Sequence, residues 1–335
     1  MTGVKRTLII FGPTVTGKTS LAIKLAKKLN EEIVSADSRQ VYKNLDIGTG
    51  KVSFDSKTEK YNGYWQVDGV KTYGFDIAMP GQAFSVANFI DFASRTIKTI
   101  EKQNKIPIIV GGTGFYIKSL LYGIDSIGIA ANKRLRKLLE KEKVEDLYKR
   151  LEALNQIRAQ SMNASDRANP RRLIRAIEIA SYKSTFKNSN INYQPFILTK
   201  EGPTIYPDKG RTNISIIGLS APNNYLFKKA DNWLDLRIKK GLIEEVDSLL
   251  AQNIPAVWLD SLGLEYRWIS RYLLNKIDKN IAIERLKGDI HSLIRRQKTY
   301  FSQFKDIQIY DITQKNWNQQ LEINIENWLK NKQKN

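Results

Sequence analysis

The sequence contains no cysteine and only one histidine, His291. Without cysteine, the chain forms no disulfide, uses no thiolate in catalysis and builds no cysteine-ligated zinc site. A single histidine also excludes a histidine pair or a histidine-rich metal site. These absences rule out the redox and metal chemistries that depend on those two residue types.

Long apolar runs are also missing, because no stretch of about 18 consecutive apolar residues occurs, and we expect no transmembrane helix. Met1 to Arg6 lead directly into a strand-like segment without a small-residue cleavage site, which argues against a signal peptide. We therefore expect no association with a membrane and a cytoplasmic location.

Acidic residues are scarce relative to basic ones. The 335 residues include 54 Lys and Arg but only 34 Asp and Glu, a formal net charge of +20. Residues 132–215, a quarter of the chain, carry a net charge of +9. Such an excess favours a polyanionic partner, and a lysine-rich solvated surface is the alternative. Hydrophobic residues make up 41%, enough for a packed core, and the length suits about two domains.

Strand-like and helix-like segments alternate along most of the chain. Short apolar strands are predicted at 7–11, 32–36, 106–110 and 214–219, with a hairpin at 64–73 that turns at Asp68-Gly69. Amphipathic helices are predicted at 20–29, 84–101, 115–121, 223–250 and 281–304. This alternation indicates a parallel sheet with helices on both faces.

The middle of the chain has a different character. Residues 132–187 have a mostly helical, strongly basic pattern, residues 187–213 are predicted as a loop, and the tail after Lys330 is predicted to be disordered. We therefore predict an α/β fold of two parts. Residues 1–123 and 213–330 form a P-loop NTPase-like core with a parallel sheet, and residues 124–212 form a basic, mostly helical insertion.

The clearest motif is a phosphate-binding loop, G-x-x-x-x-G-K-T, which lies between a predicted strand and a predicted helix. Its backbone N–H groups can surround phosphate oxygens at the start of a helix. The lysine adds a positive charge, and the threonine hydroxyl is placed to bind Mg²⁺. The motif specifies a polyphosphate or nucleotide ligand rather than a reaction. Its residues are Gly12, Pro13, Thr14, Val15, Thr16, Gly17, Lys18 and Thr19.

Two further motifs follow predicted strands. The first, SADSRQVY, places Asp37 at a carboxyl end of the sheet, where open α/β sheets bind their ligands. A carboxylate there can hold Mg²⁺, accept a proton from a nucleophile, or simply cap the next helix. The second is the glycine-rich Gly111–Tyr116, which is either a ligand-binding turn or an ordinary strand-to-helix turn. The segment Asp46–Lys51 is another glycine-rich turn with a lysine, a weak signal alone.

A basic helix is predicted from NPRRLIRAIE in the insertion. Pro170 suits the first turn of a helix, and Arg171 and Arg175 share a face because they lie four residues apart. Arginines in this arrangement suit phosphate or guanine contacts, and a solvated charged face is the alternative.

These blocks, in this order, resemble the tRNA dimethylallyltransferase family. The resemblance spans Gly12 to Phe301. SADSRQVY, GGTGFY and NPRRLIRAIE are specific to the family, whereas the phosphate loop is shared with many nucleoside triphosphatases. The matching stretches are GPTVTGKT, SADSRQVYKNLDIGTGK, DIAMPGQAFSVANF, GGTGFYIKSLLYG, NPRRLIRAIEI, GLIEEV and RRQKTYF.

The resemblance implies transfer of a dimethylallyl group from dimethylallyl diphosphate to N6 of the adenosine just 3′ of the tRNA anticodon. Diphosphate leaves as the allylic C1–O bond breaks, and Lys18, a Mg²⁺ held by Thr19 and the loop amides are expected to stabilise its charge. Asp37 is the expected acceptor of the amine's proton. The implied catalytic residues are Asp37, Lys18, Thr19 and Thr113.

The same resemblance implies that the insertion grips the anticodon stem-loop and that an adenosine leaves the loop's stack to react. The expected partners are therefore this stem-loop and dimethylallyl diphosphate, and the family is typically monomeric. The implied tRNA-binding residues are Asp37, Ser38, Arg39, Gln40, Thr113, Arg136, Arg171, Arg172 and Arg175.

Several positions depart from the family's pattern. Trp233 stands where the family usually has an arginine that is expected to bind the diphosphate. Lys229 or Arg237, each one helical turn away, is our hypothetical substitute. The other departures are Leu262–Glu265 in the LGYKE block, Ser302 in place of an arginine, and Tyr73-Gly74-Phe75 in place of HHL.

Other functions remain open at this point. An adenylate isopentenyltransferase, acting on free AMP, ADP or ATP, would share the phosphate loop and the aspartate but would not need the basic insertion. A small-molecule P-loop kinase would leave SADSRQVY without a purpose. A catalytically weak homologue that only binds RNA would not need Asp37.

Overall fold

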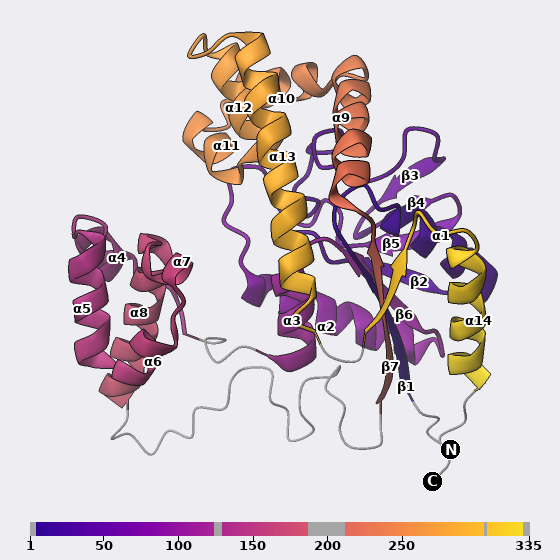
Figure 1. Cartoon of the computed structure of the whole chain (residues 1–335), viewed down its shortest axis with the longest axis horizontal. Helices are drawn as coiled ribbons and strands as arrows, with labels where there is room; N and C mark the ends of the chain where they lie inside the picture. Colours follow the sequence, from indigo (N-terminus) through magenta and orange to yellow (C-terminus); the bar gives the residue numbers. More distant parts are fainter. Residues whose placement is uncertain (1–4, 124–128, 187–211, 305–306, 331–335) are drawn as a thin grey trace. The chain divides into compact units, whose positions relative to one another are not determined.

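A computed structural model describes residues 5–123, 129–186, 212–304 and 307–330. The chain divides into two compact units, one of Met1–Tyr122 with Pro203–Asn335 and one of Gly123–Gly202. The first unit holds the sheet, and the second is helical (Figure 1). The predicted loop and tail fall outside the described residues, apart from Thr212 and Asn213, which belong to a strand.

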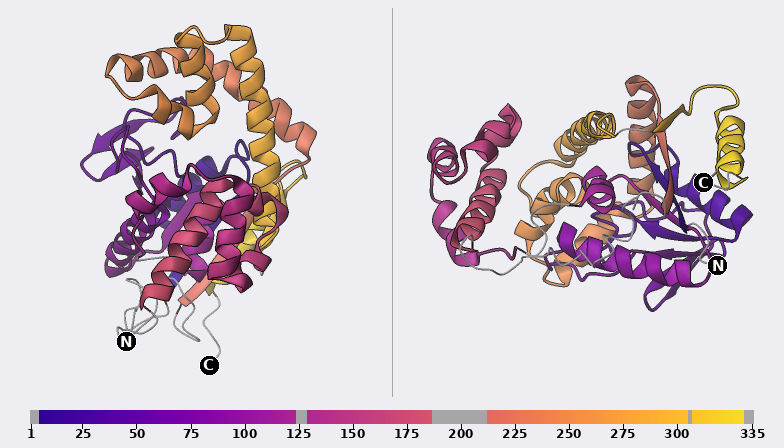
Figure 2. Two further views of the ribbon diagram at one scale, coloured as in Figure 1. Left: turned by 90° about the vertical axis from the view of Figure 1, so that its left-hand side faces the viewer. Right: turned by 90° about the horizontal axis from the view of Figure 1, so that it is seen from below.

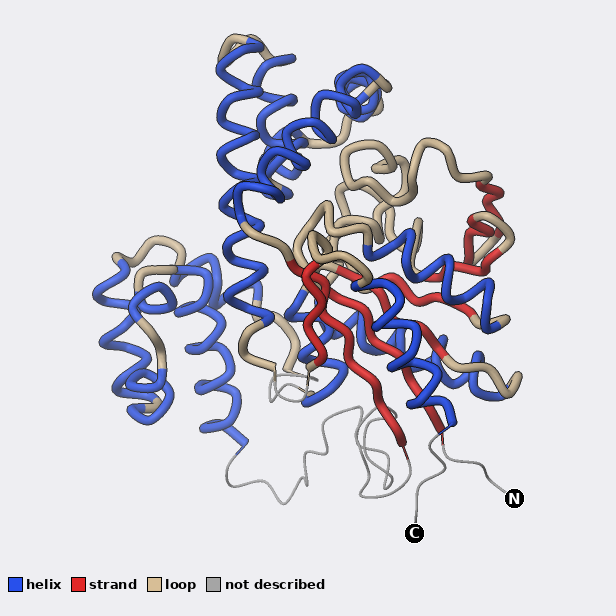
Figure 3. The backbone as a smooth tube through the Cα atoms, turned by 45° about the vertical axis from the view of Figure 1, so that its right-hand side comes forward, coloured by secondary structure: helices blue, strands red, loops and turns tan. Residues whose placement is uncertain are grey.

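One mixed sheet forms the centre of the first unit (Figure 3). Within the described residues it has eight strands, in the order β3-β4-β5-β2-β6-β1-β7-β8. All neighbours are parallel except β3–β4 and β4–β5, which form antiparallel hairpins at one edge. The strands are β1 (Lys5–Phe11), β2 (Glu32–Ser35), β3 (Thr58–Tyr61), β4 (Tyr64–Val67), β5 (Val70–Tyr73), β6 (Pro107–Gly111), β7 (Thr212–Ser220) and β8 (Gln308–Asp311).

The predicted strands and the hairpin at Asp68-Gly69 are confirmed. The sheet order puts β1 between β6 and β7, so that Leu8 lies beside Ile108 on one side and Ser215 on the other. The segment after the insertion therefore returns to the first sheet. Because β1, β2 and β6 are parallel neighbours, the turns that follow them gather at the same edge.

Helices cover both faces of this sheet. Leu8 and Ile10 pack in one cluster with α1 and α14, and Ile9 points to the opposite face because side chains alternate along a strand. Helix α2 contacts β2 and β6. The helices of this unit are α1 (Lys18–Leu29), α2 (Val86–Lys102), α3 (Gly114–Tyr122), α9 (Asn223–Lys239), α10 (Leu242–Ala251), α11 (Ala256–Leu262), α12 (Leu264–Leu273), α13 (Lys279–Phe301) and α14 (Trp317–Lys330).

The prediction of one helix over residues 223–250 is wrong. Helix α9 ends at Lys239 and α10 begins at Leu242. Gly241, which separates them, has a φ of 101°, a left-handed conformation that costs little only in glycine. The break lets α10 turn and pack against α12, while α13 runs from α12 past α9 to α3 (Figure 2).

The second unit is a small helical bundle. Its buried side chains, among them Leu147, Leu151 and Leu173, come from helices that are amphipathic but short. Asn132, Asn155 and Asn163 cap three of the helices by accepting backbone N–H groups. The helices are α4 (Lys133–Leu139), α5 (Val144–Leu154), α6 (Gln156–Ser161), α7 (Ala164–Arg167) and α8 (Pro170–Phe186).

No helix in the described ranges is both long enough and apolar enough to cross a membrane.

Candidate active site

The phosphate loop joins β1 to α1, which begins at Lys18. Its residues Thr14, Val15, Gly17, Lys18 and Thr19 line a cavity of about 760 Å³. The other three residues of the motif do not line the cavity: Gly12, Pro13 and Thr16. The Thr16 hydroxyl donates to Pro13 O at 2.9 Å, and this hydrogen bond helps to set the shape of the loop. The prediction for these eight residues as ligand contacts stays a prediction.

Lys18 is the central cation of the loop. Its ammonium donates to the carbonyl of Pro13 at 2.7 Å. Burial lowers the pKa of Lys18 to about 8, and the nearby carboxylate of Asp37 opposes that shift. Lys18 therefore remains mainly charged at neutral pH, with a desolvated ammonium that an anion in the cavity could pair with.

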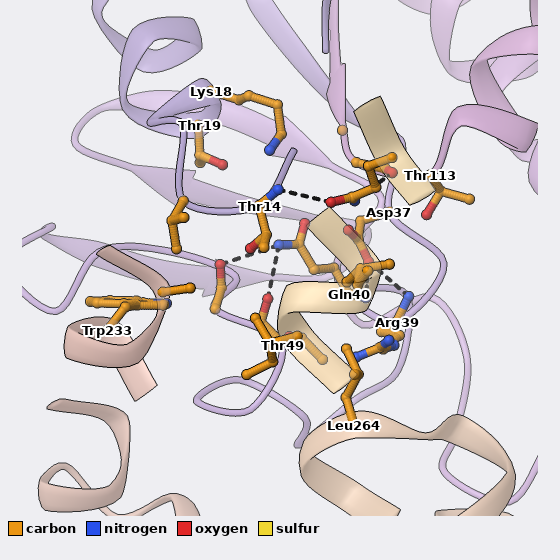
Figure 4. A pocket seen from close by; sticks show the side chains of 18 of the residues that line it. Thr14, Lys18, Thr19, Asp37, Arg39, Gln40, Thr49, Thr113, Trp233 and Leu264 are labelled. Atoms are coloured by element: carbon orange, nitrogen blue, oxygen red, sulfur yellow. Dashed lines mark hydrogen bonds between the residues drawn. The ribbon is translucent and has the colours of Figure 1, made fainter. Parts of the chain in front are cut away.

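Asp37 lies across the cavity from Lys18 and Thr19 (Figure 4). Its Oδ1 accepts the backbone N–H groups of Arg39 at 3.0 Å and Gln40 at 3.4 Å. These two bonds form a turn and do not cap a helix, as the sequence had left open, because no helix follows Asp37 before α2 at Val86. Oδ2 makes no hydrogen bond with any described residue, so one carboxylate oxygen orients the side chain and the other remains available.

Thr113 joins the turn after β6 to the turn after β2. Its hydroxyl accepts the backbone N–H of Ser38 at 3.0 Å and donates to the Ser38 hydroxyl at 3.3 Å. Its own N–H donates to Ala36 O at 3.3 Å. Hydrogen bonds therefore hold Thr113 against Ser38, next to Asp37, and these three residues form one surface of the cavity.

Arg39 and Gln40 also line the cavity, but their side chains are occupied. Gln40 is buried, accepts from the Ser35 hydroxyl at 2.8 Å and donates to Gly50 O at 3.2 Å. Arg39 pairs with Glu265 at 3.1 Å. Their contact with tRNA stays a prediction.

The turn at Asp46–Lys51, a weak signal in the sequence, is firmly held. The carboxylate of Glu245 accepts the N–H groups of Asp46, Ile47 and Gly48 at 2.7–2.9 Å. The hydroxyl of Tyr266 donates to the same carboxylate at 2.9 Å. Because Gly48, Thr49 and Gly50 line the cavity, Glu245 fixes one of its walls from behind.

Lys51 secures the other end of that turn. Its side chain is fully buried, and its ammonium pairs with Asp46 at 2.6 Å and Asp76 at 2.5 Å. A buried charge is tolerated only with such partners. Lys51 is therefore committed to the fold and cannot serve as a ligand contact.

The hypothesis that Lys229 or Arg237 replaces the family's arginine stays a prediction. Arg237 is 5% exposed, and its guanidinium donates to Gly48 O at 2.5 Å and to Glu265 at 2.8 Å. Lys229, Trp233 and Arg237 all line the cavity, and partial burial lowers the pKa of Lys229. Lys229 is the better placed of the two candidate substitutes.

The predicted arginines of the insertion lie in the second unit. Arg136 and Arg175 both bind Glu178, whose side chain is 1% exposed, at 2.7 Å and 3.1 Å. Arg172 pairs with Asp166, and Arg171 is exposed on α8. Arg136 and Arg175 thus stabilise this unit, and a contact of any of the four with tRNA stays a prediction.

Sequence reasoning missed three residues that hold the cavity: Glu245, Glu265 and Gln297. Gln297 lines the cavity and hydrogen-bonds to Thr14 and Gly112. Glu245 lies in GLIEEV and Gln297 lies in RRQKTYF, two of the stretches that resemble the family. The resemblance could therefore have pointed to both residues, although nothing in their local sequence indicates what they contact.

No group of three or more His, Asp or Glu side chains within the described ranges could hold a metal ion unaided. The Thr19 hydroxyl lines the cavity and makes no hydrogen bond within those ranges. Mg²⁺ commonly takes only one or two protein ligands and completes its shell with water and substrate phosphates. The donors present therefore fit an ion that arrives with a phosphate ligand.

Comparisons with known proteins agree on one family. A family model described as IPP transferase matches residues 40–304. The curated tRNA dimethylallyltransferase of Acetivibrio thermocellus is 34% identical over 304 residues, covering 90% of each chain. That of Clostridioides difficile is 34% identical over 318 residues, covering 92% of each chain.

Solved structures give the same result. The tRNA isopentenylpyrophosphate transferase of Bacillus halodurans superposes with a TM-score of 0.65 and 28% identity, covering 97% of this chain and 96% of that chain. A eukaryotic dimethylallyltransferase acting on tRNA has a TM-score of 0.71 and 22% identity, covering 96% of this chain and 79% of that chain, and shows likeness of fold. The predicted P-loop NTPase-like fold is confirmed by these neighbours.

Proposed function

The chain belongs to the IPP transferase family, and we propose that it transfers a dimethylallyl group from dimethylallyl diphosphate to tRNA. The acceptor is N6 of the adenosine just 3′ of the anticodon, and diphosphate is released. The names of the curated relatives favour this function over the adenylate isopentenyltransferase and the RNA-binding alternatives.

The observation that carries the proposal is one cavity with two chemically different walls. One wall is the phosphate loop with Lys18 and Thr19, and the other is the Asp37–Thr113 surface (Figure 4). A diphosphate leaving group suits the first wall, and an amine that must lose a proton suits the second. A plain nucleotide-binding protein would have no need for the second wall.

The phosphate loop supports departure of diphosphate. As the allylic C1–O bond breaks, its electron pair stays with the diphosphate, which gains negative charge. The Lys18 ammonium and the loop N–H groups at the start of α1 stabilise that charge in a partly desolvated cavity. A bound Mg²⁺, held by Thr19 and phosphate oxygens, would add positive charge there.

Asp37 supports attack by the exocyclic amine. Its Oδ1 is fixed by two backbone N–H groups, which leaves Oδ2 to accept a hydrogen bond from N6. That bond orients the amine toward C1, and Asp37 takes the proton as the N–C bond forms. The Thr113 hydroxyl, next to Asp37, is suited to contact the same base.

The basic insertion supports binding of the anticodon stem-loop. Residues 132–215 carry a net charge of +9, and Arg171 on α8 is exposed. Lysine and arginine contacts to phosphates supply most sequence-independent affinity for nucleic acid. We propose that residues 124–212 provide this grip for a monomeric enzyme that acts on tRNA in the cytoplasm.

The test is a competition between acceptors. The protein is incubated with Mg²⁺, dimethylallyl diphosphate, unmodified tRNA and free AMP, and the nucleosides are analysed by mass spectrometry. We expect prenylated adenosine in the tRNA digest and unchanged AMP. Prenylated AMP alone would assign the adenylate alternative, and bound tRNA without either product would assign the RNA-binding one.

A further inference from the structure

Gln297, on α13, bridges the two walls of the cavity. Its Oε1 accepts the backbone N–H of Thr14 at 2.9 Å, and its Nε2 donates to the carbonyl of Gly112 at 2.8 Å. Thr14 belongs to the phosphate loop after β1, and Gly112 to the turn after β6. One carboxamide therefore uses both its acceptor and its donor to join the two turns.

Helix α13 holds Gln297 rigidly. A Cβ built on Gly114 would lie 2.3 Å from Tyr300 Cδ1, so the last turn of α13 packs directly on the start of α3. The rings of Phe11 and Phe301 stack at 4.3 Å, and the Lys298 ammonium donates to Ala221 O at 2.9 Å. Gln297 lies one turn before Phe301, on a part of α13 that packs against β1 and α3. These contacts hold its side chain in place.

The bridge also lies close to Asp37. A Cβ built on Gly112 would lie 2.8 Å from Gln297 Nε2 and 3.7 Å from Asp37 Oδ2, so both side chains approach the same point. The next residue, Thr113, bonds to Ser38. An unbroken series of contacts therefore leads from the phosphate loop, through Gln297 and Gly112, to the turn that carries Asp37.

We propose that Gln297 is a positioning residue that sets the separation between the leaving diphosphate and the acceptor amine. The proposal rests on the proposed function. Transfer requires N6 to reach C1 as the C1–O bond opens, and an error of about 1 Å in such an alignment costs roughly 100-fold in rate. Gln297 carries no charge, so its proposed role is to hold the two turns at the right separation. Lys18 instead stabilises the charge of the diphosphate, and Asp37 accepts the proton of the amine.

The test measures where the allyl group goes. If the walls drift apart, water competes with the amine: the C1–O bond breaks, water oxygen attacks C1, a proton is lost and dimethylallyl alcohol forms with diphosphate. The ratio of this alcohol to prenylated tRNA does not depend on how much of the enzyme is active. A merely structural defect would lower both products and leave the ratio unchanged.

Two variants separate the halves of the bridge. Gln297→Met keeps the length but removes both hydrogen bonds, and Gln297→Glu keeps an acceptor for Thr14 N–H but cannot donate to Gly112 O. We expect each to lower kcat by roughly 100-fold and to raise the alcohol ratio by about tenfold, with KM for tRNA within about twofold. Gln319→Met, an exposed glutamine on α14, is the matched control and should behave as the wild type.

The outcomes are distinct. A raised ratio in both variants supports the proposal. If the wild type prenylates tRNA but both variants have the wild-type ratio of alcohol to prenylated tRNA, the proposal is overturned, whether or not kcat falls. Absence of prenylated tRNA with the wild-type protein refutes the proposed function instead.

Discussion

At the scale of single residues, the cavity pairs a desolvated ammonium with a carboxylate held by the backbone. Lys18 and Asp37 interact electrostatically and line one cavity, yet they follow different strands. The positive charge of Lys18 suits the departing diphosphate, and the negative charge of Asp37 suits the amine that loses a proton. Two predictions at this scale test those roles separately.

Replacing Asp37 with Asn should remove the proton acceptor and keep the turn. The amide oxygen can still accept from the backbone N–H groups of Arg39 and Gln40, so the fold should persist. We expect the rate of prenyl transfer to fall by about 10²–10⁴-fold. Single-turnover kinetics would measure this, and tRNA binding, measured on filters, should change far less than the rate, because Asp37 makes only one of the proposed contacts with tRNA. Transfer within tenfold of wild type would contradict the role of Asp37 as base.

Lys18 should make diphosphate binding depend on pH. Because burial lowers its pKa to about 8, the ammonium that attracts the anion is present below pH 8 and lost above it. We expect the Kd for dimethylallyl diphosphate, measured by calorimetry, to rise as the pH increases from about 7 to about 9.5, since an arginine or a free lysine would stay charged there.

Lys18→Arg is the control for this titration. Its guanidinium keeps its charge over the whole range, so its affinity should vary with pH less than that of the wild type, with Lys229 as the remaining lysine of lowered pKa in the cavity. A wild-type Kd that is flat over the range would show that Lys18 is not the titrating group.

At the scale of elements, the first turn of α10 holds a loop that is far away in the sequence. The carboxylate of Glu245 accepts three N–H groups of the Asp46–Gly48 segment. Glu245→Gln should leave some of them without an acceptor and lower the free energy of unfolding by about 1–3 kcal/mol. Urea denaturation measures the loss. Glu244→Gln, an exposed neighbour on the same turn, should have almost no effect.

Glu178 should link the stability of the second unit to pH. Burial disfavours its ionised form, but hydrogen bonds from Arg136, Arg175 and the Asn132 N–H outweigh burial and lower its pKa. The stabilisation is therefore complete above the unfolded pKa of about 4.3 and is lost as pH falls through the lower folded value. Hydrogen exchange should show residues 133–180 opening at acid pH.

Glu178→Gln should remove this pH dependence of stability. Residues 133–180 should exchange their amide hydrogens faster than in the wild type even at pH 7, because Arg136 and Arg175 lose their charged partner. If exchange in the variant matched the wild type at neutral pH, the ion pairs would not be what holds the unit together.

Local patterns predicted the phosphate loop, the turns with Asp37 and Thr113 and six of the eight strands of the described residues, because each depends on residues close together in the chain. Strands β3 and β8, at the two edges of the sheet, are largely exposed and have no buried apolar run that would predict them. The break at Gly241 was missed because apolar spacing continues across it. The contacts of Gln297 and Glu245 could not be predicted, since their partners lie 185–283 and 197–199 residues away. The sheet order and the path of α13 bring Gln297 to its partners, and the position of α10 brings Glu245 to the Asp46–Gly48 segment.

At the scale of the whole molecule, the excess of positive charge should govern tRNA affinity. Each phosphate contact that is removed lowers the salt dependence of binding by about one unit on a log–log plot. We expect Arg171→Gln with Arg172→Gln to weaken tRNA binding and reduce that slope by about two. Binding of inorganic diphosphate should not change, and an unaltered slope would place the tRNA contact elsewhere.

The position of β1 between β6 and β7 has a consequence for synthesis of the chain. Residues 112–211 separate β6 from β7, so a ribosome adding about 5–20 residues per second needs roughly 5–20 s to make that segment. Throughout this interval one side of β1 has unpaired N–H and C=O groups, which can pair with other nascent chains. The inserted unit thus delays closure of the sheet, and one edge of β1 stays exposed on the emerging chain until β7 has been made.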